Sequence, residues 1–371
     1  MRNIAGILLA GLLILPVLTS CGRIPDWTDR ERMCRDFLLR EMTEEDGTVY
    51  TRTNVTRSLF RQVYDRTELL GSGILSESVG LLMRYALLDE DPELFAREAD
   101  FVRKRLISNC GLIRWKVSAD RDLVSTSNAA IDDLRIAHVL VLAGTKWGKS
   151  EYLETADGVS QNILYLMVSD GGLRDYLDWE GCSQPQAAGD IVLSYLDLEA
   201  MRALEDRDPR WSPVLERSKA IMEAGALPTG LFMERYDYES GSYLGEQANM
   251  INQIYCGMHM APSQAKNRGL LDFLRERFEE DGVIYASYDA RTGKPSRFFE
   301  STSVYAMSAR YAMRMGDEAF AMRCLKKMVL FQNRNRVSPL FGSFADDEVY
   351  SFDNLQALLA LKEFNLLREK E

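Results

Sequence analysis

Six runs in the sequence begin with a glycine and continue with apolar and aromatic residues: GTVYTR (47–52), GLIRWKV (111–117), GLRDYL (172–177), GLFMERYD (230–237), GVIYASYD (282–289) and GSFADD (342–347). Successive glycines are 52 to 64 residues apart. Self-similarity at a nearly constant spacing indicates a repeat architecture, in which each repeat is one supersecondary unit. The sequence therefore predicts six copies of one unit.

Helical periodicity occupies the sequence between these runs. It predicts twelve helices, at about 28–43, 76–89, 92–107, 129–146, 149–168, 189–206, 210–225, 247–261, 263–278, 299–315, 317–332 and 352–368. Every second connection is short and contains glycine or proline, as in Leu88-Asp-Glu-Asp-Pro92, and these residues end helices. The other connections are long, and each contains one of the six glycines.

This alternation pairs the helices as hairpins and places every long loop at the same end of the molecule. Six hairpins around a circle give an all-α fold, an (α/α)6 barrel with long hairpin-like loops on one face. Inner helices of such a barrel should be apolar nearly all round, as residues 80–88 and 136–143 are, and outer helices should be amphipathic, as residues 92–106 are. An open helical solenoid is the alternative.

The N-terminus has the pattern of a secretory signal. Arg2 precedes an apolar stretch, and Leu18-Thr-Ser-Cys21 places small residues before a cysteine. This end resembles a bacterial lipobox, which implies that Cys21 carries a lipid and anchors an extracytoplasmic protein to the membrane. A transmembrane anchor is the alternative, but the apolar stretch is short for a span. The expected divisions are a signal peptide (1–20), an anchored linker (21–27) and one barrel domain (28–371).

Composition argues against several partners. The net charge of −11 disfavours nucleic acid, and also makes a neutral or amino-sugar polymer a better partner than a polyanion. His138 and His259 are far apart in the sequence, so we expect neither a metal nor another cofactor. A monomer is expected. The five cysteines after Cys21 show no CxxC pair, which predicts neither a disulfide framework nor a zinc site: Cys34, Cys110, Cys182, Cys256 and Cys324.

The predicted long loops are rich in aromatic residues. Aromatic rings in loops are often packing anchors, but eight of them at one end of a barrel also suggest a surface that binds carbohydrate. These residues are Trp27, Trp115, Tyr176, Trp179, Tyr236, Tyr238, Tyr285 and Tyr288.

Glu77 is the leading candidate for an acid catalyst. It lies in LSESVG (75–80), in the first turn of a predicted inner helix and so at the mouth of the barrel. A helix N-terminus stabilises an ionised acid and lowers its pKa, and this effect alone would explain a glutamate beside a capping Ser76. A general acid would need apolar cover or a neighbouring carboxylate to raise its pKa. Asp133, near the start of the next inner helix, could supply that carboxylate.

Four segments resemble glycoside hydrolase family 8, in order and spacing, across residues 76–211. They are LSESVGLLMRYALL (75–88), which is similar to the segment with the general acid; GLIRWKV (111–117), similar to Gly-Leu-Phe-x-Trp-Lys; residues 129–148, similar to the Asp-Ala-Asp-Leu-x-Ile-Ala helix that ends in Trp-Gly; and SYLD (194–197) followed by DPRW (208–211). Ser78 replaces the usual glycine, and Leu81-Leu-Met83 replaces Tyr-Gly-Met.

The resemblance implies an inverting, metal-free endo-hydrolase of β-linked polysaccharides. Glu77 would be the proton donor, Asp133 would bind and distort the sugar at the cleavage subsite, and Trp115 would stack on a sugar ring. Inversion requires a second carboxyl group, roughly 6.5–9.5 Å from the first, to activate water. The other residues expected to bind substrate are Tyr195, Tyr236, Asn252 and Tyr255.

The general base departs from the family pattern. The family's Tyr-Asp-Ala-x-Arg motif falls on Ile251-Asn-Gln-Ile-Tyr255, which places Asn252 where an aspartate should act. Asp237 is the expected base, because related membrane-bound exopolysaccharide hydrolases use an aspartate at a similar distance from the acid. However, Tyr-Asp-x-x-Ser-Gly is also ordinary turn chemistry, and it recurs at Asp289. Asp289, Asp175 and Asp178 therefore remain alternatives.

The function expected from the sequence is an extracytoplasmic, membrane-anchored glycoside hydrolase that trims a secreted polysaccharide. A non-catalytic glycan-binding lipoprotein is one alternative, which Asn252 and the partial acid motif favour. A polysaccharide lyase is another, but it needs a Tyr or His base and basic residues around a uronate, and this chain is acidic.

Overall fold

The computed structural model describes residues 26–54, 73–118, 122, 124–179, 185–260, 268–344 and 348–369. The predicted signal peptide, the lipidation site Cys21 and most of the linker lie outside the described residues, as does Cys182. No helix in the described ranges is both long and apolar enough to cross a membrane.

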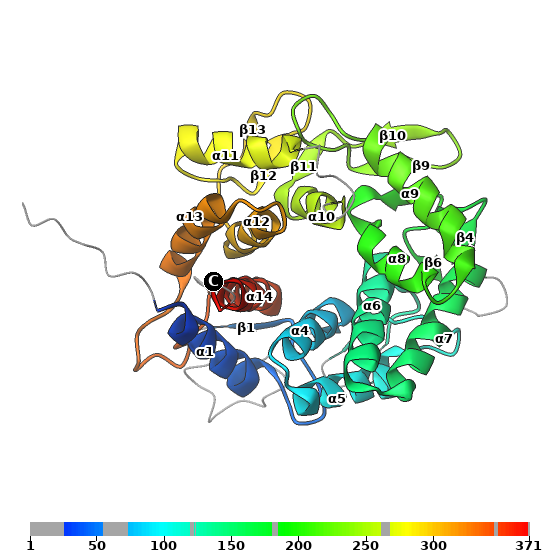
Figure 1. Cartoon of the computed structure of the whole chain (residues 1–371), viewed down its shortest axis with the longest axis horizontal. Helices are drawn as coiled ribbons and strands as arrows, with labels where there is room; N and C mark the ends of the chain where they lie inside the picture. The colour runs from blue at the N-terminus through cyan, green and yellow to red at the C-terminus, as the bar shows by residue number, and fades with distance from the viewer. Residues whose placement is uncertain are drawn as a thin grey trace, which may run out of the picture.

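The described helices form two concentric rings (Figure 1). The inner ring consists of α4 (Ser76–Leu88), α6 (Ala130–Trp147), α8 (Leu198–Glu205), α10 (Met250–Met260), α12 (Thr302–Arg314) and α14 (Ser351–Arg368). The outer ring consists of α1 (Trp27–Phe37), α5 (Pro92–Phe101), α7 (Ser150–Leu166), α9 (Ser212–Ala224), α11 (Gly269–Asp281) and α13 (Glu318–Met328). Short π-helices extend α1 (Leu38–Met42) and α5 (Val102–Leu106), and 3₁₀ turns occur at Leu193–Tyr195 (η3), Pro209–Trp211 and Val329–Phe331.

The inner ring is closed. Each inner helix contacts the next one, and α14 returns to contact α4 (Figure 1). α14 also packs against α1, so the two ends of the chain form the sixth hairpin. Burial separates the rings as predicted: ten of the thirteen residues of α4 are buried, but only five of the ten in α5. The (α/α)6 barrel is therefore confirmed, and the open solenoid is excluded.

One predicted helix is partly wrong. In the stretch 189–206, residues Asp190–Val192 form strand β8, and only Leu198–Glu205 are α-helical. The β-branched Ile191 and Val192 favour a strand, and they pair with strand β9 (Arg235–Asp237). The helix starts where the side chain of Asp197 accepts a hydrogen bond from Ala200 N at 3.0 Å.

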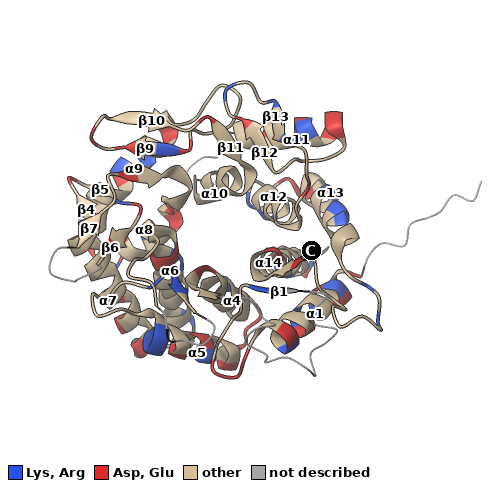
Figure 2. Cartoon of the chain, turned by 180° about the vertical axis from the view of Figure 1, so that it is seen from behind, with Lys and Arg blue, Asp and Glu red and all other residues tan. Residues whose placement is uncertain are grey.

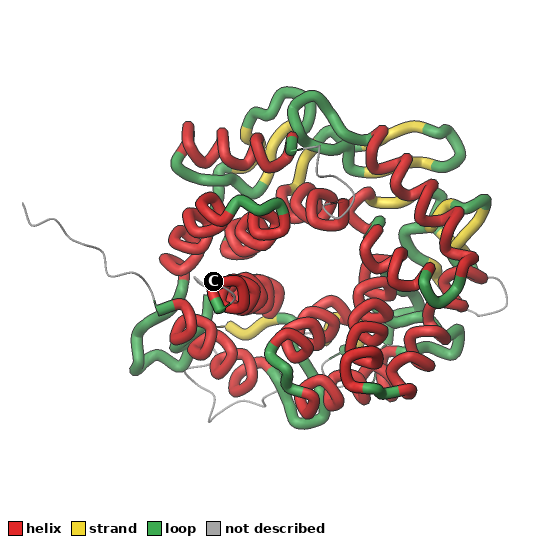
Figure 3. Tube along the Cα trace, viewed as in Figure 1, coloured by secondary structure: helices red, strands yellow, loops and turns green. Residues whose placement is uncertain are grey.

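The long loops carry short antiparallel strands (Figure 3). Two sheets have three strands each: β8, β9 and β10 (Ser242–Leu244), and β11 (Gln247–Asn249), β12 (Ser287–Asp289) and β13 (Pro295–Arg297). The two-stranded pairs are β1 (Arg52–Asn54) with β14 (Glu348–Tyr350), β2 (Ile74–Leu75) with β3 (Lys116–Val117), β4 (Val168–Ser169) with β5 (Gly172–Leu173), and β6 (Leu177–Asp178) with β7 (Gln186–Ala187).

The repeated glycines form tight turns after the outer helices. In five repeats, the residue two positions after the glycine pairs with the segment that ends the outer helix: Val49 with Thr43, Ile113 with Ile107, Leu173 with Val168, Phe232 with Ala226 and Phe344 with Gln332. The turn glycines have positive φ: Gly47 (90°), Gly111 (75°), Gly171 (73°), Gly230 (86°) and Gly342 (96°). In the third repeat the turn glycine is therefore Gly171, one residue before the Gly172 that the sequence pattern suggested.

A second repeated feature ties these turns to the barrel. The N–H two positions after a glycine donates to the fourth residue of the following inner helix: Ile113 to Asp133 (2.7 Å), Phe232 to Gln253 (2.7 Å), Ile284 to Tyr305 (3.1 Å) and Phe344 to Asn354 (2.8 Å). We call these four accepting side chains the latches. All four are buried, and an unpaired buried N–H costs about 1–3 kcal/mol, so the latches fix the loops onto the inner ring.

The close approach of a turn to an outer helix should be measurable at Gly342. A Cβ at Gly342 would lie 2.1 Å from the carbonyl oxygen of Met33, so Gly342→Ala should cost more than the ~1–2 kcal/mol of a left-handed alanine. Gly148 is the matched control, because it also has positive φ but its Cβ would meet nothing within 4 Å. Urea unfolding followed by circular dichroism compares the two variants. Equal losses would show that the contact with α1 does not constrain this turn.

Candidate active site

The N-terminal ends of the inner helices gather at the end of the barrel that carries the long loops, which we call the mouth. Glu77 is the second residue of α4, and Asp132 is the third residue of α6. Acidic and basic residues occur on inner helices as well as on the outer ring (Figure 2). Charged side chains inside a barrel are tolerated only when they are paired or neutral. The partners of each charged side chain therefore determine its protonation state and the chemistry open to it.

A hydrogen-bonded group of side chains joins α4, α6 and α10 at the mouth. Ser76 Oγ donates to Asp132 Oδ2 at 2.6 Å, and Arg135 forms an ion pair with the other oxygen of Asp132. Arg135 also donates to the Tyr255 hydroxyl at 3.3 Å and stacks over its ring, 5.5 Å from the centroid. Arg135 and Asp132 are almost completely withdrawn from solvent, so each depends on the other.

The group continues along the barrel axis. Gln356 Nε2 donates to the Tyr255 hydroxyl at 2.8 Å, and Arg310 donates to Gln356 Oε1 at 2.6 Å. Arg310 also binds both carboxylate oxygens of Glu363, at 2.8 and 3.1 Å. We call the whole series the axial chain: Ser76, Asp132, Arg135, Tyr255, Gln356, Arg310 and Glu363. It connects five of the six inner helices through side chains.

Two residues of the axial chain shift the pKa of Glu77 in opposite directions. Burial raises the pKa of Glu77 to about 7, the charge of Arg135 opposes the rise, and the charge of Asp132 adds to it. Burial thus outweighs the lowering expected from the helix N-terminus. A carboxyl group with this pKa is about half protonated at neutral pH, which is the state required of a general acid.

The neighbouring carboxylate is Asp132 rather than the expected Asp133. Successive residues of a helix point about 100° apart, so only one of the pair can face the axis. Asp133 is fully buried and is one of the latches: one oxygen accepts from Ile113 N and the other from the Asn128 side chain. It therefore supports the loop of GLIRWKV and does not reach the mouth. Both oxygens of Asp133 thus already accept hydrogen bonds within the protein, and its expected role in binding sugar stays a prediction.

Trp115 lies beside Glu77. Its carbonyl accepts the N–H of Ser76, the first residue of α4, at 3.1 Å. Its side chain is 40% exposed, and Lys116 Nζ lies 5.8 Å from the ring centroid. An exposed indole at the rim of the mouth is available for stacking. Of the other loop aromatics, Tyr176 is also exposed, but Trp27, Trp179 and Tyr288 are buried packing anchors.

Tyr195, the last residue of η3, is influenced by the charges of acidic groups. Burial raises the pKa of its hydroxyl, and so do the charges of Asp175, Asp132 and Glu77, in that order. Asp175 is itself buried and paired with Arg235 at 2.7 Å. Its pKa is raised by burial in spite of Arg235. The charges of Asp175 and of Glu77 thus both act on the Tyr195 hydroxyl.

Asp237 holds a hairpin turn. Its Oδ1 accepts from Ser240 N at 2.7 Å and from Ser240 Oγ at 2.6 Å, and these bonds lower its pKa. Asp289 does the same in the neighbouring β12–β13 hairpin, with Thr292 N and Oγ1, both at 2.7 Å. Its pKa is also lowered, by Thr292. Both aspartates are therefore ionised and structurally alike.

The other residues expected at the site have no described contact with Glu77. Tyr236 packs its ring against Tyr238 and Tyr243, with centroids 5.2 and 5.0 Å apart, so it stabilises the β8–β9–β10 sheet. Asn252 is the third residue of α10 and is partly buried, and Asp178 lies on β6. Sequence reasoning missed Asp132, Arg135 and Gln356. Asp132 and Arg135 could have been found in the sequence, because they are opposite charges three residues apart on an otherwise apolar helix.

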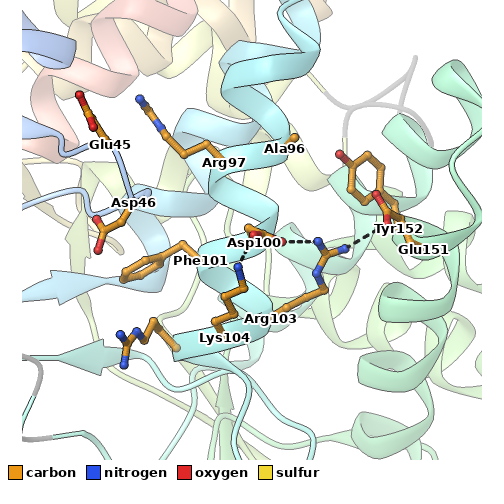
Figure 4. Close-up of a pocket in the computed structure, with 11 residues that line it drawn as sticks. Glu45, Asp46, Ala96, Arg97, Asp100, Phe101, Arg103, Lys104, Glu151 and Tyr152 are labelled. Carbon is orange, nitrogen blue, oxygen red and sulfur yellow. Dashed lines mark hydrogen bonds and ion pairs between the residues drawn. The ribbon is translucent and has the colours of Figure 1, made fainter.

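A separate hollow of about 580 Å³ lies on the outer surface, along α5 and α7 (Figure 4). Four of its charged residues pair with one another: Asp100 binds Arg103 and Lys104, and Arg103 reaches Glu151 at 3.9 Å. It contains none of the residues of the mouth, and we assign it no catalytic role.

Comparison with known proteins supports the fold. No protein-family model matches the chain. The chain is 27% identical to the putative lipoprotein YdaJ of Bacillus subtilis (strain 168) over 289 residues. The matched region covers 77% of this chain and 78% of the relative. A solved structure described as a novel alpha-amylase from Clostridium perfringens is 28% identical, with a TM-score of 0.81, over 91% of this chain and 97% of that one.

Another solved structure similar to this chain is the endoglucanase Cel10 of Klebsiella pneumoniae, a family 8 glycosyl hydrolase. It is 13% identical, with a TM-score of 0.61, over 90% of this chain and 99% of that one. At this identity the likeness concerns the fold. The chain thus has the barrel of family 8 glycosyl hydrolases, which confirms the resemblance seen in the sequence.

The pKa of Glu77 should respond to one aspartate of α6 and not to its neighbour. Asp132→Asn removes a negative charge beside Glu77 and should lower the pKa of Glu77 below about 7. Asp133→Asn keeps the acceptor for Ile113 N and should leave that pKa unchanged. Carboxyl-carbon NMR titration of both variants measures the shift. An unchanged pKa in Asp132→Asn would contradict the arrangement described here.

Proposed function

We propose that the mouth is the active site of an extracytoplasmic glycoside hydrolase that cleaves a secreted polysaccharide at the cell surface. The observation that carries the proposal is Glu77, a carboxyl group with a pKa of about 7 at the mouth of a barrel of the family 8 type. The relative's description as a putative lipoprotein supports an anchored location for this chain as well.

Glu77 acts as the general acid in this proposal. Its proton passes to the glycosidic oxygen as the bond between that oxygen and the anomeric carbon breaks. Arg135 then stabilises the carboxylate that forms, because its charge favours the ionised state of Glu77. Tyr195 and Trp115 position the sugar in this proposal.

Asp237 is the proposed general base. Water attacks the anomeric carbon from the opposite face and inverts it, while Asp237 takes the water's proton. One oxygen of Asp237 holds the turn, and the other would accept the proton. Asp175 is the alternative base, since it is a buried carboxyl group whose charge, like that of Glu77, acts on Tyr195. Its pairing with Arg235, however, weakens it as a proton acceptor.

A β-linked polymer is the proposed substrate, on the resemblance to family 8 and the endoglucanase among the structural neighbours. The neighbour described as an alpha-amylase makes an α-linked glucan the competing substrate. A panel of secreted polysaccharides that contains both linkages, in neutral and amino-sugar form, distinguishes the two.

Removal of the acid should abolish hydrolysis. Glu77→Gln keeps the size and polarity of the side chain but cannot donate a proton, so kcat on the best polymer should fall by about 10²–10⁴-fold. Release of reducing ends measures the loss, and thermal unfolding confirms that the variant is folded. Unchanged turnover would disprove the mechanism. Glycan binding without turnover by the parent protein would instead identify a binding lipoprotein, and an unsaturated product would identify a lyase.

The base can be tested against an internal control. Asp237→Asn and Asp289→Asn alter two turns of the same geometry, so both should affect stability equally. Only Asp237→Asn should reduce kcat, again by about 10²–10⁴-fold. Equal kcat values for the two variants would remove Asp237 as the base, and a loss confined to Asp175→Asn would assign that role to Asp175.

The pH dependence follows from the two pKa directions. The acid must be protonated, so kcat/KM should fall as pH rises through about 7, where Glu77 loses its proton. The base must be ionised, so activity should persist at acidic pH and fall only below the ordinary range of an aspartate, because the pKa of Asp237 is lowered. A pH profile with its alkaline limit far above neutrality would contradict the assignment of Glu77.

A further inference from the structure

Phe298 and Phe299 are exposed side by side where β13 ends. They are 74% and 52% exposed, although phenylalanine is usually buried. Residues 297 and 300 on either side are charged. An exposed apolar pair with a polar border often marks a binding surface.

The position of Phe298 is fixed by a series of rings that starts in the core. Phe273 of α11 packs on Tyr288 with centroids 5.1 Å apart, Tyr288 lies 6.3 Å from Tyr285, and Tyr285 lies 5.3 Å from Phe298. The backbone is fixed as well, because Ala286 N donates to Phe299 O at 2.9 Å. The ring of Phe298 and the backbone of Phe299 are therefore held in place before any ligand arrives, which lowers the entropy cost of binding.

This pair belongs to the rim of the mouth. Phe299 lies three residues before α12, whose N-terminal end is at the mouth. In the inner ring, α14 lies between α12 and α4, so the start of α12 is two helices away from the start of α4 (Figure 1). Trp115 lies at the start of α4. Exposed aromatic rings thus lie at two separate places on the rim of the opening that contains Glu77.

We propose that Phe298 and Phe299 form a sugar-binding platform on the rim of the mouth at the start of α12, which holds a pyranose ring of the polysaccharide away from the bond that is cleaved. Aromatic faces pack well against the C–H faces of sugar rings, and the adjacent Arg297 and Glu300 offer hydrogen bonds to hydroxyl groups. The inference rests on the proposed function. The polysaccharide then extends along the rim of the mouth from Trp115 to the platform.

The platform should distinguish long from short substrates. A short oligosaccharide that binds only around Glu77 does not reach the platform, whereas a polymer does. The ratio of kcat/KM for polymer to kcat/KM for the shortest cleaved oligosaccharide should therefore fall about five- to tenfold in Phe298→Ala and Phe299→Ala, as expected for a loss of about 1–1.4 kcal/mol. Tyr165→Ala is the matched control, since Tyr165 is 84% exposed at the end of the outer helix α7, and its ratio should not change.

Binding separates this inference from the proposed hydrolysis. In a Glu77→Gln background, affinity electrophoresis through gels that contain the glycan should show retardation, which Phe298→Ala and Phe299→Ala reduce and Tyr165→Ala does not. This result supports the platform even if the parent protein proves inactive. Undiminished retardation in both phenylalanine variants would overturn it. Binding to phospholipid vesicles that depends on Phe298, with glycan retardation unaffected, would also overturn it and make the pair a membrane contact.

Discussion

The Arg135–Asp132 ion pair is the interaction on which the rest of the mouth depends. Two charges withdrawn from water are tolerated only when each satisfies the other and their remaining hydrogen-bonding groups are paired. Asp132 accepts from Ser76 at the start of α4, and Arg135 donates to Tyr255 on α10. One ion pair thus joins three inner helices beside Glu77. Burial can then raise the pKa of Glu77 without leaving any charge of this pair isolated.

The loops that complete the mouth are fixed by a different device. Each latch is the fourth residue of an inner helix, so the helix start and the glycine turn before it are tied at one geometry. The latch side chains differ in chemistry, since Asp133, Gln253, Tyr305 and Asn354 share only the ability to accept a hydrogen bond. This explains why an acidic residue beside the mouth can be structural. It also explains how rigid aromatic residues can be presented on loops.

Periodicity was enough to predict the barrel, because hairpins with alternating short and long connections leave few other closed arrangements. The periodicity gave a wrong prediction at Ile191 and Val192, which form a strand within a predicted helix. The preference of β-branched side chains for strands decided the structure there. The residues of the site were harder to predict from the sequence. Glu77 could be found from its segment, but Asp132 and Asp133 are adjacent, and sequence alone does not show which one faces the axis. The burial that raises the pKa of Glu77 likewise arises from helices far apart in the sequence.

The stereochemistry of the first product shows whether the mouth hydrolyses a glycan with inversion. Proton NMR of the anomeric signals, recorded within minutes of adding enzyme to the best polymer, shows which anomer is released before mutarotation. The account predicts the anomer opposite to that of the linkage cleaved, because water attacks from the face opposite Glu77 in a single displacement. Release of the retained anomer, or of no reducing sugar from any glycan, would contradict it.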